Sequence, residues 1–163
     1  MPEIVFKPIG IIHSPFSHPV GMPIQPVAAK GIKGSVEVFR EYLSGLDDLD
    51  GFSHIILIYH FHLSTGYSLK VKPFLDNREH GVFATRAPKR PNPIGISVVK
   101  LLKSDRNMLI IENVDIVDNT PLLDIKPFVP KFNGTGKITL GWLTGSMDQV
   151  SNWKSDNRYD SGT

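Results

Sequence analysis

Short apolar runs alternate along this chain with segments rich in glycine and proline. The most apolar run, Ile55 to Tyr59, lies inside residues 53–63 and is typical of a central strand with neighbours on both sides. In residues 34–39, Val36 and Val38 alternate with other residues, which predicts a short strand with one buried face. Further extended segments are predicted at residues 4–12, 81–85, 94–102, 108–114 and 137–143, with a hairpin turn at 104–107.

Only one segment has the spacing of a helix. Leu43, Leu46 and Leu49 recur every three residues, which predicts a short helix over residues 41–49, weakened by Gly45. Six or more strands against one helix predict an all-β fold, a small single-domain β-barrel with at most one or two short helices. On this pattern the barrel occupies residues 1–145, and residues 146–163 form a loose polar C-terminal tail.

The composition excludes several kinds of site. The 163 residues include no cysteine, which excludes disulfides, thiolate metal sites and cysteine nucleophiles. The formal net charge of +2 is too small to indicate a nucleic-acid partner, so any such surface has to be a local patch. The longest apolar run is far shorter than a membrane span, and the N-terminus lacks the pattern of a signal peptide. We therefore expect a cytoplasmic protein without a membrane partner.

Residues 81–95 carry the first candidate chemistry. Prolines at 88, 91 and 93 stiffen the backbone, and Arg86, Lys89 and Arg90 add positive charge. A stiff loop with fixed cations suits the recognition of a phosphate or carboxylate, because little conformational entropy is lost on binding. A rigid barrel-closing turn with solvated charges explains the same residues equally well.

Residues 115–127 form the second candidate segment, with three carboxylates at Asp115, Asp118 and Asp124. Carboxylates accept hydrogen bonds from ribose hydroxyls or an adenine amine, and they coordinate hard cations. Alternatively, Asp118 stabilises a turn and Asp124 pairs with Lys126 to support the fold.

His54, His60 and His62 share one face of the predicted central strand. Such a face can hold zinc with a third ligand, but histidines at strand ends more often serve the core or hydrogen bonding. We expect no metal, and His62, where the strand ends, is the functional candidate among the three.

Several motifs of this sequence together resemble the TsaA-like family, which contains the TrmO-type (YaeB-type) tRNA methyltransferases. The most specific is Arg90-Pro91-Asn92-Pro93-Ile94-Gly95, preceded by Phe83-Ala84-Thr85-Arg86. The others are Ile9 to Phe16, Pro23 to Pro26, Leu46 to His54 leading to Phe61-His62, and Asp124-Ile125-Lys126-Pro127. They cover most of residues 9 to 143.

The resemblance implies a small β-barrel that forms a homodimer, binds S-adenosyl-L-methionine and methylates N6 of a threonylcarbamoyl-modified adenosine beside the tRNA anticodon. By position, it implies cofactor contacts at Pro23, Ile24, Gln25, His62, Leu63, Arg86, Ile96, Asp118, Asn119, Thr120 and Pro121. Three places depart from the common family pattern. Ile24 replaces an arginine, and Asn119 replaces a glycine, which is tolerable because asparagine adopts positive φ. After Pro130, where an acidic residue is usual in the family, Lys131-Phe132-Asn133 follow.

For catalysis we expect Asp118 or Asp124 to orient the adenine amine and accept its proton. Lys89, Arg90 and Lys126 are the candidates for contacts with RNA. Two other functions also fit the sequence: a methyltransferase of a small molecule, favoured by the modest charge, and a non-catalytic RNA-binding module. Turnover with the cofactor separates the enzymes from the module, and salt-sensitive tRNA binding separates RNA from small-molecule acceptors.

Overall fold

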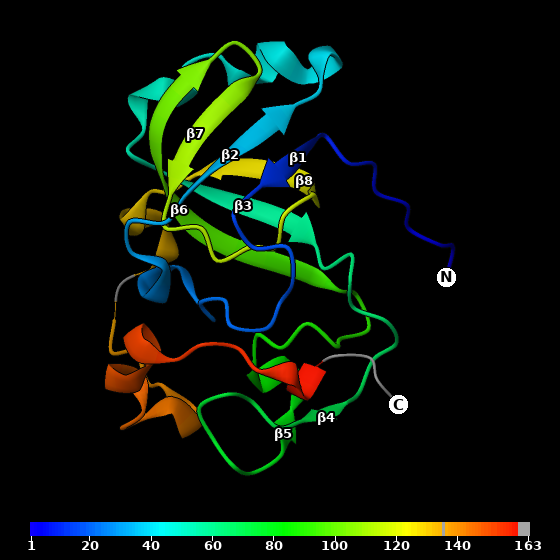
Figure 1. The fold of residues 1–163 in the computed structure, drawn as a ribbon, viewed down its shortest axis with the longest axis vertical. Coiled ribbons are helices and arrows are strands. Elements are labelled where there is room, and N and C mark those ends of the chain that lie inside the picture. Colours follow the sequence, from blue (N-terminus) through cyan, green and yellow to red (C-terminus); the bar gives the residue numbers. More distant parts are fainter. Residues whose placement is uncertain (135, 160–163) are drawn as a thin grey trace.

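A computed structural model describes residues 1–134 and 136–159 of the chain (Figure 1). In this part of the chain, antiparallel strands close into a six-stranded barrel in the order β1-β2-β7-β6-β3-β8, and a separate two-stranded sheet is formed by β4 and β5. The strands are β1 (Gly10–His13), β2 (Lys33–Val38), β3 (His54–His60), β4 (Lys70–Val71), β5 (His80–Gly81), β6 (Ile94–Asp105), β7 (Met108–Glu112) and β8 (Thr120–Pro127). The predicted all-β barrel is confirmed.

The helices of the described residues are all short 3-10 helices. They are η1 (Pro26–Ala29), η2 (Arg40–Leu46), η3 (Leu49–Gly51), η4 (Val82–Ala84), η5 (Pro130–Asn133), η6 (Gly141–Leu143), η7 (Met147–Asn152) and η8 (Asn157–Tyr159). None of these described helices has the length and hydropathy needed to cross a membrane.

The barrel core consists of side chains from alternate strand positions. In β3, Ile55, Leu57 and Tyr59 are buried while the residues between them are partly exposed. The core also includes Val36 and Leu109, both fully buried. Burial of each such aliphatic side chain stabilises the fold by roughly 1.5–3 kcal/mol. The central strand, the strand over 34–39 and the hairpin of β6 and β7 agree with the pattern in the sequence, although β6 continues to Asp105 and turns at Arg106, whose φ is 55°.

The predicted helix over 41–49 is instead two 3-10 helices, η2 and η3. Asp48 separates them with a φ of 64°, and Gly45 lies within η2. A repeat of three residues matches the three residues per turn of a 3-10 helix, whereas an α-helix requires 3.6. The three-residue spacing of Leu43, Leu46 and Leu49 therefore agrees with a 3-10 helix, whereas the expectation of a single helix is corrected to two.

Three expectations for extended segments are corrected by the structure, and one strand was not expected. Residues 4–9 lie outside β1, which begins only after Pro8, a residue with no amide hydrogen to donate. Residues 82–84 form η4, and residues 137–143 hold no strand but end in η6. Residues 120–127, which were not among the predicted strands, form β8, which pairs with β1 and β3.

The segment after residue 145 is not a loose tail in its described part. Lys154 pairs with Pro23 in an isolated bridge, the amide of Gly21 donates to Ser155 O, and Val150 is buried at 4% exposure. In Figure 1 this segment lies at the lower end of the molecule, beside β4 and β5 and away from η2 at the top. Residues 160–163 of the predicted tail lie outside the described residues, and the division of the chain at residue 145 stays a prediction.

Candidate functional site

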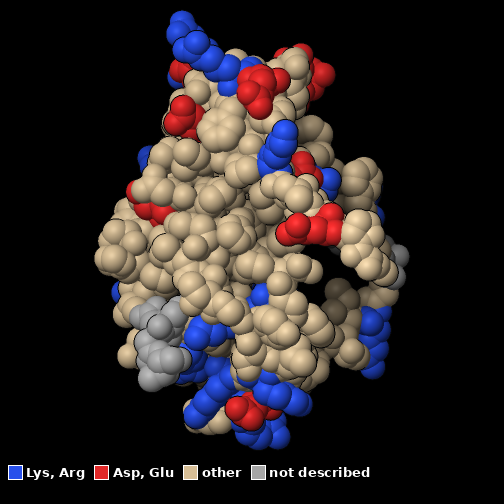
Figure 2. All heavy atoms as spheres, turned by 90° about the vertical axis from the view of Figure 1, so that its right-hand side faces the viewer, with Lys and Arg blue, Asp and Glu red and all other residues tan. Residues whose placement is uncertain are grey.

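A cleft of about 1360 Å³ lies between the barrel and the C-terminal segment. One side is formed by barrel elements: the end of β3, the start of β6 and the residues before β8. The other walls are the Pro-rich loop before η1 (residues 14–25), the loop after η4, and the C-terminal segment. Most of the lining is apolar, with a few polar groups. A hollow is visible near mid-height on the face of the molecule drawn in Figure 2.

Gly95 shapes the barrel side of this cleft. A Cβ atom at this position would come within 2.9 Å of Phe61 Cζ and still closer to the Tyr59 ring. These two rings pack edge to face, with centroids 5.4 Å apart. Glycine is therefore required here so that both rings can close over the start of β6.

A chain of hydrogen bonds leads from the barrel core into the cleft. The Tyr59 hydroxyl donates to Ser97 Oγ across 3.0 Å, and the Ser97 hydroxyl donates to Asp115 Oδ1 across 2.7 Å. Burial raises the pKa of the Asp115 carboxyl to about 6, against the lowering effects of the Ser97 hydrogen bond and of Arg86. Burial likewise raises the pKa of Tyr59, so this phenol stays protonated and able to donate.

Arg86 ties two walls of the cleft together. Its Nη1 donates to Gln25 Oε1 across 2.9 Å, which links the loop after η4 to the Pro-rich loop. Arg86 is otherwise exposed towards the cleft, and its planar guanidinium retains donors for an anionic ligand.

His62 lies just beyond the end of β3 and contacts the start of β8. The Thr120 hydroxyl donates to Val117 O across 2.6 Å, so its oxygen is left to accept a hydrogen bond from Nδ1 of His62, 3.4 Å away. Partial burial, and then the neighbouring His60, lower the pKa of His62. The imidazole is therefore neutral at neutral pH, and its Nε2 is an acceptor.

Eight of the cofactor contacts implied by the resemblance line this cleft, and three do not. The eight are Pro23, Ile24, Gln25, His62, Leu63, Arg86, Ile96 and Thr120. Asp118, Asn119 and Pro121 lie outside its lining. Asp118 Oδ1 accepts from the amide of Ser14, 3.1 Å away, and Oδ1 lies 3.5 Å from His13 Nδ1, so this carboxylate fastens β1 to the turn.

The turn itself has the predicted backbone, since Asn119 has a φ of 60°. Asn119 Nδ2 donates to Asp118 Oδ2 across 2.9 Å. Pro121 pairs with Ile11 in the barrel.

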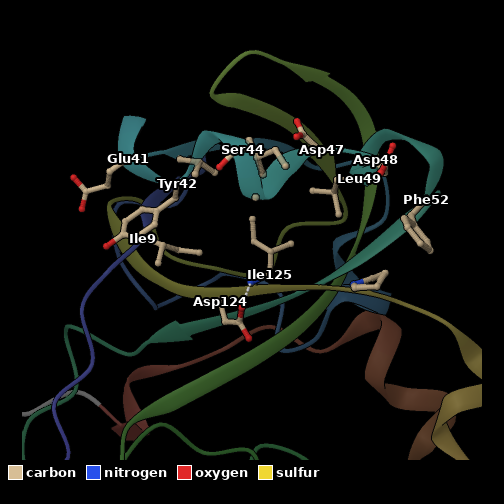
Figure 3. A pocket seen from close by; sticks show the side chains of 14 residues that line it. Ile9, Glu41, Tyr42, Ser44, Asp47, Asp48, Leu49, Phe52, Asp124 and Ile125 are labelled. Atoms are coloured by element: carbon tan, nitrogen blue, oxygen red, sulfur yellow. Dashed lines mark hydrogen bonds between the residues drawn. The ribbon is translucent and has the colours of Figure 1, made fainter.

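Asp124 lies on a different part of the barrel. It borders a second hollow of about 550 Å³ under η2, where Figure 3 shows Ile125 pointing towards η2 and Asp124 on the other side of β8. The register of β8 against β3 shifts between Leu122 and Asp124, and this irregularity lets Leu122 and Ile125 both face inward. Asp124 Oδ2 pairs with Lys126 Nζ at 2.7 Å, as the structural alternative proposed.

The other predicted RNA contacts have different surroundings. Nη1 of Arg90 donates to the carbonyls of Thr85 and Ala87, each 3.2 Å away, so its guanidinium holds the loop together while it borders the cleft. Lys89 does not line the cleft, and its carbonyl accepts from the amide of Ser68.

Tyr59 and Asp115 line the cleft, and Ser97 lies between them in the hydrogen-bond chain; none of the three was among the predicted site residues. Ser97 had a detectable signal, because it is a polar residue at an inward position of a strand whose other inward residues are Gly95, Val99 and Leu101. The C-terminal wall was also missed: Trp142 stacks on His80 with ring centroids 4.4 Å apart, and its Nε1 donates to Ala84 O. In the described part of the chain, no group of three or more His, Asp or Glu side chains could hold a metal ion.

Comparison with known families gives one match that covers most of the chain. A family described as the tRNA-methyltransferase O N-terminal domain matches residues 11–134. This range includes all six barrel strands except Gly10, and most of the cleft.

Individual relatives agree with this match. A protein of Pyrococcus abyssi named "Probable S-adenosyl-L-methionine-binding protein" is 54% identical over 156 residues, which is 96% of this chain and 85% of the relative. The tRNA (adenine(37)-N6)-methyltransferase of Escherichia coli K12 is 36% identical over 140 residues, 80% of this chain and 60% of that enzyme. The crystal structure of TrmO from Pseudomonas aeruginosa superposes with a TM-score of 0.72 and 34% identity, over 86% of this chain and 62% of that chain. This chain therefore spans less than two thirds of the length of these two enzymes.

Proposed function

This chain belongs to the family of the tRNA-methyltransferase O N-terminal domain, and from this membership we propose that it is an S-adenosyl-L-methionine-dependent methyltransferase of N6 of a tRNA adenine. The acceptor that we propose is a threonylcarbamoyl-modified adenosine next to the anticodon. The observation that supports this function is that one cleft collects eight of the expected cofactor contacts from five separate segments of the chain.

The cleft suits the cofactor in size and chemistry. Its volume exceeds the range of about 300–1,000 Å³ of typical small-molecule sites, which leaves room for the acceptor base beside the cofactor. Apolar groups such as Leu63 and Ile96 offer a surface for an adenine ring, and Arg86 offers a cation for a carboxylate. When bound, the cofactor supplies an electrophilic methyl group on a sulfonium.

The residues of the chain then have to align the acceptor and remove a proton. Alignment is favoured by the stiff walls, because Arg86 bridges the loop after η4 to the Pro-rich loop. The adenine amine releases a proton as N6 is methylated, and Nε2 of the neutral His62 is an acceptor for it in the cleft. Asp118 and Asp124, the acceptors expected from the sequence, remain candidates only for a substrate that extends beyond the cleft.

The tRNA backbone is proposed to contact the end of the molecule that carries β4 and β5. Figure 2 shows lysine and arginine side chains gathered at this lower end. The exposed Lys70, Lys72 and Arg78 belong to this sheet and its connection, and Lys89 is joined to it through the amide of Ser68. We further propose that the protein acts as a homodimer in the cytoplasm, where a second subunit extends the basic surface.

The test is transfer of labelled methyl from S-adenosyl-L-methionine to tRNA that lacks this modification. We expect methylated threonylcarbamoyl-adenosine with the wild type, and a loss of at least about tenfold in the Arg86→Ala variant, which lacks a charge-assisted hydrogen bond to the ligand. Lys103→Ala, an exposed change on β6 outside the lining of the cleft, is the matched control.

Other outcomes would redirect the proposal. Cofactor binding without transfer to tRNA would exclude the RNA acceptor and favour a small molecule. Salt-sensitive tRNA binding without turnover would identify a binding module. Absence of both would mean that this chain retains the barrel and not the chemistry.

A further inference from the structure

Building on the proposed function, we infer that Asp115 is the cation-binding group of the cleft and holds the α-ammonium of the amino-acid end of the ligand, while Arg86 holds its carboxylate. The sequence pattern presents Asp115 only as one of three carboxylates in a candidate segment, and neither the resemblance nor the relatives' names give it a part in cofactor binding. Its hydrogen bonds, its burial and the partners already held by Asp156 and Arg90 point to this role.

The carboxylate of Asp115 has few hydrogen bonds within the protein, one from Ser97 and one from its own backbone amide. Oδ1 accepts the Ser97 hydroxyl at 2.7 Å, and Ser97 is itself oriented by the Tyr59 hydroxyl. Oδ2 makes no hydrogen bond to another described residue. Since no buried side-chain oxygen of the described residues lacks a partner, Oδ2 reaches the open space of the cleft.

Two other charged side chains that line the cleft, Asp156 and Arg90, already have partners within the protein. Asp156 forms a close pair with Arg158, 2.7 Å between Oδ2 and Nη2, and Arg90 donates to two backbone carbonyls. Among the described residues that line the cleft, Asp115 is the carboxylate without an ion-pair partner. Arg86 is near enough to lower its pKa but lies beyond ion-pair distance.

This arrangement suits a zwitterionic head group. A carboxylate that is desolvated without an ion pair is electrostatically unfavourable, and an entering cation relieves that penalty. A separated anion and cation in one cleft match the adjacent ammonium and carboxylate of an amino acid. The Tyr59–Ser97 chain holds Asp115 in place before the ligand arrives, which reduces the entropy lost on binding.

The experiment compares three ligands by calorimetry on the wild type and on Asp115→Asn. S-adenosylmethionine and S-adenosylhomocysteine both carry the α-ammonium, whereas 5′-methylthioadenosine lacks the amino-acid end. We expect Asp115→Asn to weaken the first two by a similar factor of about 10 to 100, and to change the third by less than about threefold. Ser97→Ala, which retains the carboxylate but removes its donor, is expected to weaken the same two ligands by a smaller factor.

Four results would overturn this inference. Equal weakening of all three ligands would mean that Asp115 only supports the fold. Weakening of S-adenosylmethionine alone would place the carboxylate at the sulfonium and not at the ammonium. Unchanged affinities would remove Asp115 from the binding site while leaving the proposed function intact. A wild type that binds none of the three would refute the proposed function itself, and this inference with it.

Discussion

The two hollows of this molecule lie at opposite ends of the barrel and use carboxylates in different ways. The hollow under η2 is bordered by Glu41, Asp47 and Asp48, all exposed, and by Asp124, which is paired with Lys126. The cleft at the other end contains Asp115, which is partly buried, has one side-chain donor, and has no ion-pair partner among the described residues. More carboxylates border the smaller hollow, but the cleft contains the carboxylate whose pKa is raised by burial and which has no ion-pair partner among the described residues.

The comparison teaches that the environment of a carboxylate, and not the number of carboxylates, identifies a candidate site. Exposed carboxylates are solvated by water or paired with a cation, and an exposed ion pair contributes about 0–1 kcal/mol to the free energy of unfolding. A carboxylate held out of water with an open oxygen gains far more from a ligand. The following predictions test this difference between the two hollows.

The largest expected effect comes from glycine substitution. Gly95→Ala in the cleft forces a Cβ atom into the rings of Tyr59 and Phe61, and we expect a loss of about 3 kcal/mol in the free energy of unfolding, measured by urea denaturation. Gly45→Ala at the hollow under η2 meets no atom within 4 Å and is the matched control, with an expected change below about 1 kcal/mol. Equal effects would show that the rings can move apart.

The second prediction concerns stability as a function of pH. Asp115 has a folded pKa of about 6, above its ordinary 3.8, so it favours the unfolded state once it ionises. Its contribution to stability is fully present below about pH 3.8 and is lost as pH rises through about 6. We therefore expect Asp115→Asn to raise the free energy of unfolding at pH 8 by up to about 3 kcal/mol, and not to raise it at pH 3.5.

Arg86 is the charged group that opposes the rise in the pKa of Asp115, and the protonated Tyr59 hydroxyl lies behind Ser97. Asp124→Asn at the other hollow is the comparison variant, because it removes an exposed ion pair and has no comparable burial. A stability gain that is independent of pH in Asp115→Asn would refute the proposed role of its burial.

The third prediction addresses the C-terminal wall of the cleft. Trp142→Ala removes the stack on His80 and the hydrogen bond to Ala84 O, and opens this side of the cleft to water. We expect about a 5- to 10-fold loss in affinity for S-adenosylmethionine, in line with the ~0.5–1.5 kcal/mol of an aromatic pair. Tyr42→Ala, at the hollow under η2, is expected to reduce stability while leaving this affinity unchanged. Equal affinities of the two variants would mean that the wall does not contribute to binding.

The smallest effect is expected at Asp124 itself. Asp124→Asn weakens an exposed ion pair with Lys126 and is expected to lower the free energy of unfolding by less than about 1 kcal/mol, with methyl transfer to tRNA unchanged. Single-turnover measurements provide the check. A large loss in transfer at unchanged cofactor affinity would restore the catalytic role that the sequence suggested for this residue.

The sequence alone was sufficient for the barrel and for much of the cleft. The alternation around Val36 and Val38, the apolar run in β3 and the β6–β7 hairpin are local patterns, because inward and outward positions repeat every two residues. The motif ending in Gly95 and the position of Arg86 likewise depend on a short stretch of chain, and both reach the cleft.

Tertiary structure decided which carboxylate faces which hollow. Local sequence did not predict β8, because its prolines and its aspartate disfavour a strand. Pairing with β1 and β3 nevertheless holds this segment in the sheet. The register shift in β8 then turned Asp124 outward, while the hydrogen bond from Ser97, eighteen residues earlier, aimed Asp115 into the cleft. The C-terminal segment was brought over the cleft by contacts with residues as distant as Pro23 and His80. A periodic pattern specifies which residues share a face, but register and long-range packing determine what that face meets.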